Sequence, residues 1–188
     1  TDQHHGLKRW IHDPVADPIA RESGQLTLFV PSNAAGFVSP TDGSLSLRNF
    51  LIPVDSTPHP QQSVYAAMDL AEAFGCRNAV GTLLHVGDTG AFPQSFLPET
   101  AAIRWKQAFR RGPITSEILR AAEEGHADLV VMSTHGHDGF LDALRGSNTE
   151  RVIRHSPCPV LAVPSYIARE PVVSTLEQLA TGKLTVSL

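Results

Sequence analysis

The sequence predicts an α/β protein with a doubly wound parallel sheet and helices on both of its faces. From residue 47 onward, short apolar runs of strand length alternate with segments whose apolar residues recur at helical spacing. Gly and Pro residues separate these segments. With 188 residues, of which 41% are hydrophobic, the chain is long enough to bury one sizeable core. Together these observations favour one main domain with additional elements.

The predicted strands and helices follow one another along the chain. Residues 49–54 form a short apolar run that ends at Asp55, as in a buried strand. Residues 61–74 repeat apolar side chains at helical spacing, and Gly75 ends that helix. The alternation would next place a helix after strand 79–86, but Gly90, Pro93 and Pro98 favour a loop over 87–101. The remaining predicted elements are a short strand at 105–111, a helix at 114–125, a strand at 129–133, a helix at 147–156 and a strand at 159–163.

Composition and charge exclude several classes of partner. The net charge is −4 and no long run of Lys or Arg occurs, so nucleic acid is not an expected partner. No apolar stretch approaches the roughly 20 residues of a membrane span, so a membrane is not expected either. The two cysteines, Cys76 and Cys158, form no CxxC pair, which favours a reducing, cytoplasmic setting.

The segment between strand 129–133 and helix 147–156 carries the strongest functional signal. Gly136 lies near its beginning, and Gly146 and Ser147 lie at its end, directly before the helix. Free backbone N–H groups at a helix start attract anions, and glycines let the backbone approach a phosphate closely. Ser147 is placed to cap the helix or to contact a phosphate. Because Asp55, Val86 and this segment all follow strand ends, we expect them to meet in one crevice.

This spacing resembles the nucleotide-binding segment of the universal stress protein family. ATP-binding members carry Gly, two residues, Gly, nine residues, then Gly followed by Ser or Thr. Gly136, Gly146 and Ser147 match this pattern, while Ser133 stands in place of the first glycine. The sequence of residues 150–164 also resembles that family.

The resemblance implies an adenine nucleotide alpha hydrolase-like fold that binds an adenine nucleotide, with ATP the first expectation. Mg²⁺ can accompany ATP, and no other metal is predicted. By resemblance, Asp55 accepts hydrogen bonds from the ribose or the adenine edge, and Val86 meets the base through its backbone. Asp55 also fits a turn or a helix cap. The predicted nucleotide-binding residues are Pro53, Val54, Asp55, Val86, Met132, Ser133, His135, Gly136, Gly146, Ser147 and Asn148.

The N-terminal residues read as a partial internal repeat. Residues 1–31 align without a gap on 134–164, with eight identical pairs. The copy has lost the binding chemistry, because Gln3, Asp13 and Pro14 match Gly136, Gly146 and Ser147. We therefore predict a partial degenerate repeat at 1–31, a linker with a hairpin at 32–47, a universal stress protein domain at 48–164 and a tail at 165–188. Because the chain begins inside a repeat, we expect further sequence upstream.

The repeat also predicts a strand pairing. In the family, final strands commonly pair antiparallel across a dimer, so a homodimer is implied. By the same resemblance, strand 26–30 is expected to pair with strand 159–163 within this chain, which would cap an open sheet edge. The apolar helix face of the first copy, with Trp10, is expected to pack on the main domain or on a second chain.

Three functional hypotheses follow. The first is a nucleotide-binding stress protein that acts as a sensor or regulator. It is not predicted to be an enzyme, because no carboxylate pair or nucleophile motif stands out and no catalytic residue is assigned. The second is an interaction module without nucleotide, favoured by Ser133 and by the missing helix before residue 105. The third is a metal-dependent enzyme that uses His85, His135 and His137.

Overall fold

In the computed structural model, the described residues are 26–32, 34, 36–39, 41–87, 92–134 and 148–165. Predictions on the first-copy helix and Trp10, on the segment 135–147 and on most of the tail therefore lie outside the described residues.

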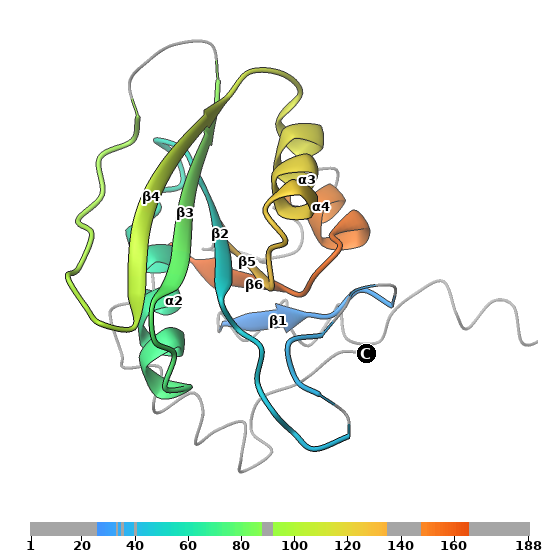
Figure 1. The fold of residues 1–188 in the computed structure, drawn as a ribbon. Helices are drawn as coiled ribbons and strands as arrows, with labels where there is room; N and C mark the ends of the chain where they lie inside the picture. The colour runs from blue at the N-terminus through green and yellow to red at the C-terminus, as the bar shows by residue number, and fades with distance from the viewer. Residues whose placement is uncertain are drawn as a thin grey trace, which may run out of the picture.

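The fold is α/β and is built on a mixed sheet of six strands (Figure 1). Strands β2 to β6 run parallel, and β1 pairs antiparallel with β6. The predicted fold class and the predicted pairing of the first and last strands are thus confirmed. The order across the sheet is β1-β6-β5-β2-β3-β4. The strands are β1 (Thr27–Phe29), β2 (Asn49–Val54), β3 (Ala79–Val86), β4 (Ile103–Arg110), β5 (Leu129–Thr134) and β6 (Val160–Pro164).

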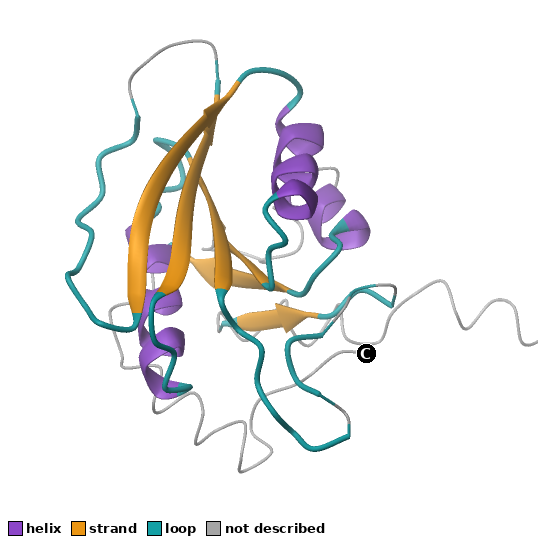
Figure 2. Cartoon of the chain, in the orientation of Figure 1, coloured by secondary structure: helices purple, strands orange, loops and turns teal. Residues whose placement is uncertain are grey.

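Helices cover both faces of the sheet (Figure 2). Helix α2 (Gln61–Ala73) packs on one face, where it meets a core that includes Phe50, Ile52 and Leu161. Helices α3 (Ile114–Glu124) and α4 (Asn148–His155) pack on the other face. This arrangement follows from the sequence, because alternate residues of each buried strand face opposite layers.

An irregular connection joins β3 to β4, and residues 92–102 contain no helix, as predicted. Side chains hold it against α2 and β4. The Gln61 side chain donates to and accepts from the backbone of Phe96, at 2.9 and 2.8 Å. The Trp105 indole N–H donates to the Pro98 carbonyl at 2.8 Å. The strand that follows starts at Ile103, two residues earlier than predicted, and ends at Arg110.

A turn precedes β2 where the sequence predicts a hairpin. Val38 and Leu45 form an antiparallel bridge, and Asp42 accepts hydrogen bonds from the backbone and the hydroxyl of Ser44. Hydrogen bonds from Ser39 and Ser44 lower the pKa of Asp42 to about 2. The predicted domain boundaries stay a prediction.

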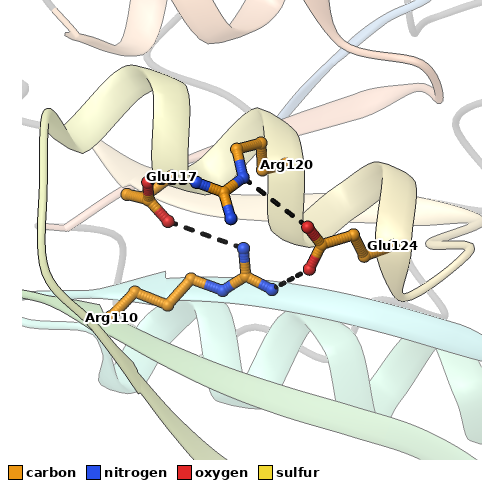
Figure 3. Close-up of polar contacts among 4 residues, drawn as sticks. All are labelled: Arg110, Glu117, Arg120 and Glu124. Atoms are coloured by element: carbon orange, nitrogen blue, oxygen red, sulfur yellow. Dashed lines mark hydrogen bonds and ion pairs between the residues drawn. The ribbon is translucent and has the colours of Figure 1, made fainter.

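An ion-pair network ties the end of β4 to α3 (Figure 3). Arg110 lies between Glu117 at 3.5 Å and Glu124 at 2.6 Å, and Arg120 contacts both carboxylates from the same helix. The hydrogen bond from Arg110 is the main cause that lowers the pKa of Glu124. The network fixes the start of α3 beside the carboxyl ends of the strands.

Candidate functional site

A pocket of about 240 Å³ lies at the carboxyl ends of the parallel strands. The ends of β2, β3 and β5 form its floor, and the first turns of α3 and α4 form its walls. Strand β2 stands where the order reverses, since β3 lies on one side of it and β5 on the other. Crevices at this position bind ligands in open α/β sheets. The lining residues are Pro53, Val54, Asp55, Thr57, Pro58, Leu84, Val86, Ile114, Ile118, Met132, Ser133, Asn148 and Thr149.

Asp55 is exposed at the rim of the pocket. One of its carboxylate oxygens accepts a hydrogen bond from the backbone N–H of Ser56 at 2.6 Å. Asp55 therefore stabilises the local turn, which is the alternative role that the sequence also allowed for it. A carboxylate has acceptor capacity for several hydrogen bonds, so this turn leaves Asp55 able to bind a donor in the pocket.

Ser133 is a strand residue that pairs with Val163 in β6. Its hydroxyl shares a hydrogen bond of 2.7 Å with Ser63 of α2, and both side chains are buried. Its backbone is not in the left-handed region, which among the described non-glycine residues is occupied by Asn78 and His126. Serine thus replaces the first glycine of the family pattern without backbone strain.

The first turns of α3 and α4 meet at the pocket. The Thr115 hydroxyl donates to the Asn148 side-chain oxygen at 3.0 Å and so links the two helix starts. The N-cap of α3 is Pro113, which forms no side-chain cap, so the N-cap residue itself leaves the first amides of that helix uncapped. Two helix starts side by side give this wall a partial positive charge.

Four predicted site residues, His135, Gly136, Gly146 and Ser147, lie outside the described residues. The other seven line the pocket. Ile114 and Ile118 also line the pocket and were not predicted as site residues. Their spacing of four places them on one face of the helix, and this spacing is the feature of the sequence that could have identified them.

His85 lies on the α2 side of the sheet. Its Nδ1 donates to the Val54 carbonyl at 3.1 Å, and its ring packs between Phe92 and Phe109. Within the described ranges no group of three potential metal ligands occurs. His135 and His137 lie outside those ranges, so the metal hypothesis stays untested.

A second pocket, of about 440 Å³, lies near the amino ends of β2 and β3. Cys76 lines it together with Arg48 and Arg77, and the Cys76 thiol donates to the Leu47 carbonyl at 3.2 Å. Burial raises the pKa of this thiol, which disfavours its thiolate form. None of the predicted site residues within the described ranges lines this pocket.

Comparison with known proteins shows similarity to one family over part of the chain. Residues 99–164 match the model of the universal stress protein family. A universal stress protein of Methanocaldococcus jannaschii is 48% identical over 52 residues, which is 28% of this chain and 31% of that protein. Over residues 99–164 the chain is similar to the universal stress protein family. A second universal stress protein, from Synechocystis, is 42% identical over 62 residues, or 33% of this chain and 40% of that protein. The chain therefore spans about a third of the length of these curated relatives.

Among solved structures, the universal stress protein UspA from Lactobacillus plantarum aligns with a TM-score of 0.49 and 23% identity, over 64% of this chain and 99% of that one. Because this likeness is modest, the similarity to universal stress proteins rests on the sequence matches. Within the described residues, none of the helices has the length and apolar character that a membrane crossing requires.

Proposed function

We propose that this chain is a universal stress protein and that it binds an adenine nucleotide, ATP first, in the pocket at the carboxyl ends of β2, β3 and β5. In this proposal it is a sensor or regulator in the stress response. The observation that carries the proposal is the lining of one pocket by seven residues that the sequence pattern selected: Pro53, Val54, Asp55, Val86, Met132, Ser133 and Asn148.

The chemistry of the pocket suits such a ligand. Ile114 and Ile118 offer an apolar wall to a purine ring, and the main chain at Val86 offers hydrogen-bonding groups to its edge. Asp55 can accept hydrogen bonds from ribose hydroxyls. The paired helix starts at Thr115 and Asn148 attract phosphate. A volume of about 240 Å³ suits the base and ribose, with the phosphates directed toward Asn148.

We propose that the protein holds the nucleotide and does not hydrolyse it. Asp55 is the one acidic residue among the described residues that line the pocket, so no carboxylate pair is present there for acid–base chemistry. Mg²⁺ would enter only together with ATP. Both cysteines are free thiols, which supports action in a reducing compartment such as the cytoplasm.

Titration calorimetry with ATP and with adenosine tests the proposal. Asp55→Asn should weaken adenosine binding about 10-fold or more, because hydrogen bonds to a charged acceptor contribute about 1.5–3 kcal/mol. Asp42→Asn is the matched control, since it removes the same charge from the exposed hairpin and should leave binding unchanged. Gly146→Asp should abolish ATP binding through repulsion of phosphate. If folded wild-type protein gives no heat with millimolar ATP or adenosine, the proposal fails.

The second candidate function is an interaction module without nucleotide. The helix-free connection at 92–102 favours it, because the connection leaves the side chain of Phe96 66% exposed. Under this alternative, Gly146→Asp changes little.

A homodimer, implied by the family resemblance, would have to use a surface other than the edge of β6. That edge already pairs with β1 of the same chain, from Thr27 opposite Ala162 to Phe29 opposite Val160. Sedimentation at increasing concentration measures whether a dimer forms.

A further inference from the structure

The two edges of the sheet differ in how well they are protected. At one edge, β1 is three residues long, and short edge strands resist pairing with other chains. At the other edge, β4 is eight residues long and pairs with β3 along its whole length (Figure 1). Among the described residues, β4 has no other strand partner. The long edge of β4 is therefore the one that offers a template for an added strand.

The backbone groups on this open edge can be assigned. The Arg110 carbonyl accepts a hydrogen bond from Gly87 N–H, so Arg110 directs its backbone toward β3. Because backbone groups alternate along a strand, Ile103, Trp105, Gln107 and Phe109 direct theirs outward. The irregular connection at 92–102 runs beside β4 (Figure 1), and the Trp105 indole N–H donates to its Pro98 carbonyl. Within the described residues, no backbone hydrogen bond outside the sheet ladders joins that connection to Ile103–Arg110.

The two faces of β4 carry different chemistry. On the α2 side, Trp105 and Phe109 are aromatic, and Phe109 is 43% exposed. On the opposite side, Arg104 and Lys106 are exposed and form no ion pair within the described part of the chain. Arg110, on the same side, is neutralised by Glu117 and Glu124. An added strand therefore meets unbalanced positive charge on one side and aromatic surface on the other.

We propose that the open edge of β4 binds an extended acidic segment of a partner protein by strand addition. In this complex, acidic side chains would lie beside Arg104 and Lys106, and alternating apolar side chains would lie beside Trp105 and Phe109. A second copy of this chain is a poor occupant, because its own Arg104 and Lys106 would be added to the same face. Positive charges at an edge repel like strands and leave it open to acidic ones.

The proposal does not depend on the nucleotide pocket, and two synthetic octapeptides test it. In one, Glu alternates with Val, and in the other, Lys alternates with Val. Fluorescence anisotropy should show that the Glu peptide binds the full chain at least about 10-fold more tightly than the Lys peptide does. The double variant Arg104→Glu/Lys106→Glu should reverse this preference.

Gln107→Pro supplies the backbone test. It removes an outward N–H but no hydrogen bond to β3, so the fold should survive, which circular dichroism checks. Binding of the Glu peptide should be lost in Gln107→Pro and kept in Gln107→Val. The proposal is overturned if neither peptide binds or if both bind equally. It is also overturned if Gln107→Pro binds the Glu peptide like the wild type. A dimer seen by sedimentation that Gln107→Pro dissociates would overturn it as well.

Discussion

The buried hydroxyl pair of Ser63 and Ser133 gives the sharpest prediction about stability. The two oxygens are 2.7 Å apart, Ser63 is fully buried, and Ser133 is 9% exposed. Removing one partner leaves the other hydroxyl buried without a hydrogen bond, which costs about 1–3 kcal/mol. Removing both partners leaves no polar group unpaired, so the cost should be close to that of one single variant.

Urea unfolding of Ser63→Ala, Ser133→Ala and the double variant measures this coupling. We expect each single variant to lose about 1–2 kcal/mol, and the double variant to lose at least about 1 kcal/mol less than their sum. For a chain of this size, a single variant should melt about 2–8 °C below the wild type. Strictly additive losses would refute the reasoning, because they would mean that the two hydroxyls do not depend on each other.

Three further predictions concern packing, charge and an unpaired hydroxyl. Gly81→Ala should destabilise the fold by about 1–3 kcal/mol, because the added methyl group would lie 2.5 Å from an indole ring on β4. The control Gly36→Ala meets no atom closer than 4.0 Å and should leave the stability unchanged. Thermal melts compare the two variants. Arg110 lowers the pKa of Glu124, so the pairing of the two residues stabilises the fold above the ordinary pKa of 4.5. This stabilisation is lost as the pH falls below 4.5 and Glu124 becomes protonated. The urea midpoint of Arg110→Leu should therefore fall less steeply between pH 6 and 3 than that of the wild type. Thr134→Val should raise stability by about 1 kcal/mol in urea, because the buried Thr134 hydroxyl has no hydrogen-bond partner among the described residues.

Most elements could be predicted because buried strands and amphipathic helices leave clear apolar patterns. The start of β4 could not, because the residues at its edge are partly polar. Arg104, Lys106 and Gln107 are exposed there, and their polarity hides the strand. The pairing of β1 with β6 could be predicted only through the internal repeat together with the family resemblance, since local pattern says nothing about which edge a strand joins.

The candidate site was predictable where it follows from strand ends. Asp55, Val86 and Asn148 line one pocket because the carboxyl ends of parallel strands and the helix starts that follow them meet at one edge. The contact between Ser63 and Ser133 joins residues 70 positions apart, so no local pattern reveals it. The side of the sheet to which His85 turns was also hidden, because it depends on the Val54 carbonyl and on two phenylalanine rings.

The central claim is that the nucleotide binds at the carboxyl edge of the sheet. The chain provides its own control, since the pocket with Cys76 and Arg77 lies at the amino ends of β2 and β3. Mapping of backbone amide chemical shifts by NMR during ATP titration is the most direct test. We expect shifts at Asp55, Val86 and Asn148, with Cys76 and Arg77 unchanged. Shifts confined to Cys76 and Arg77, or no shifts in folded protein at saturating ATP, would contradict it.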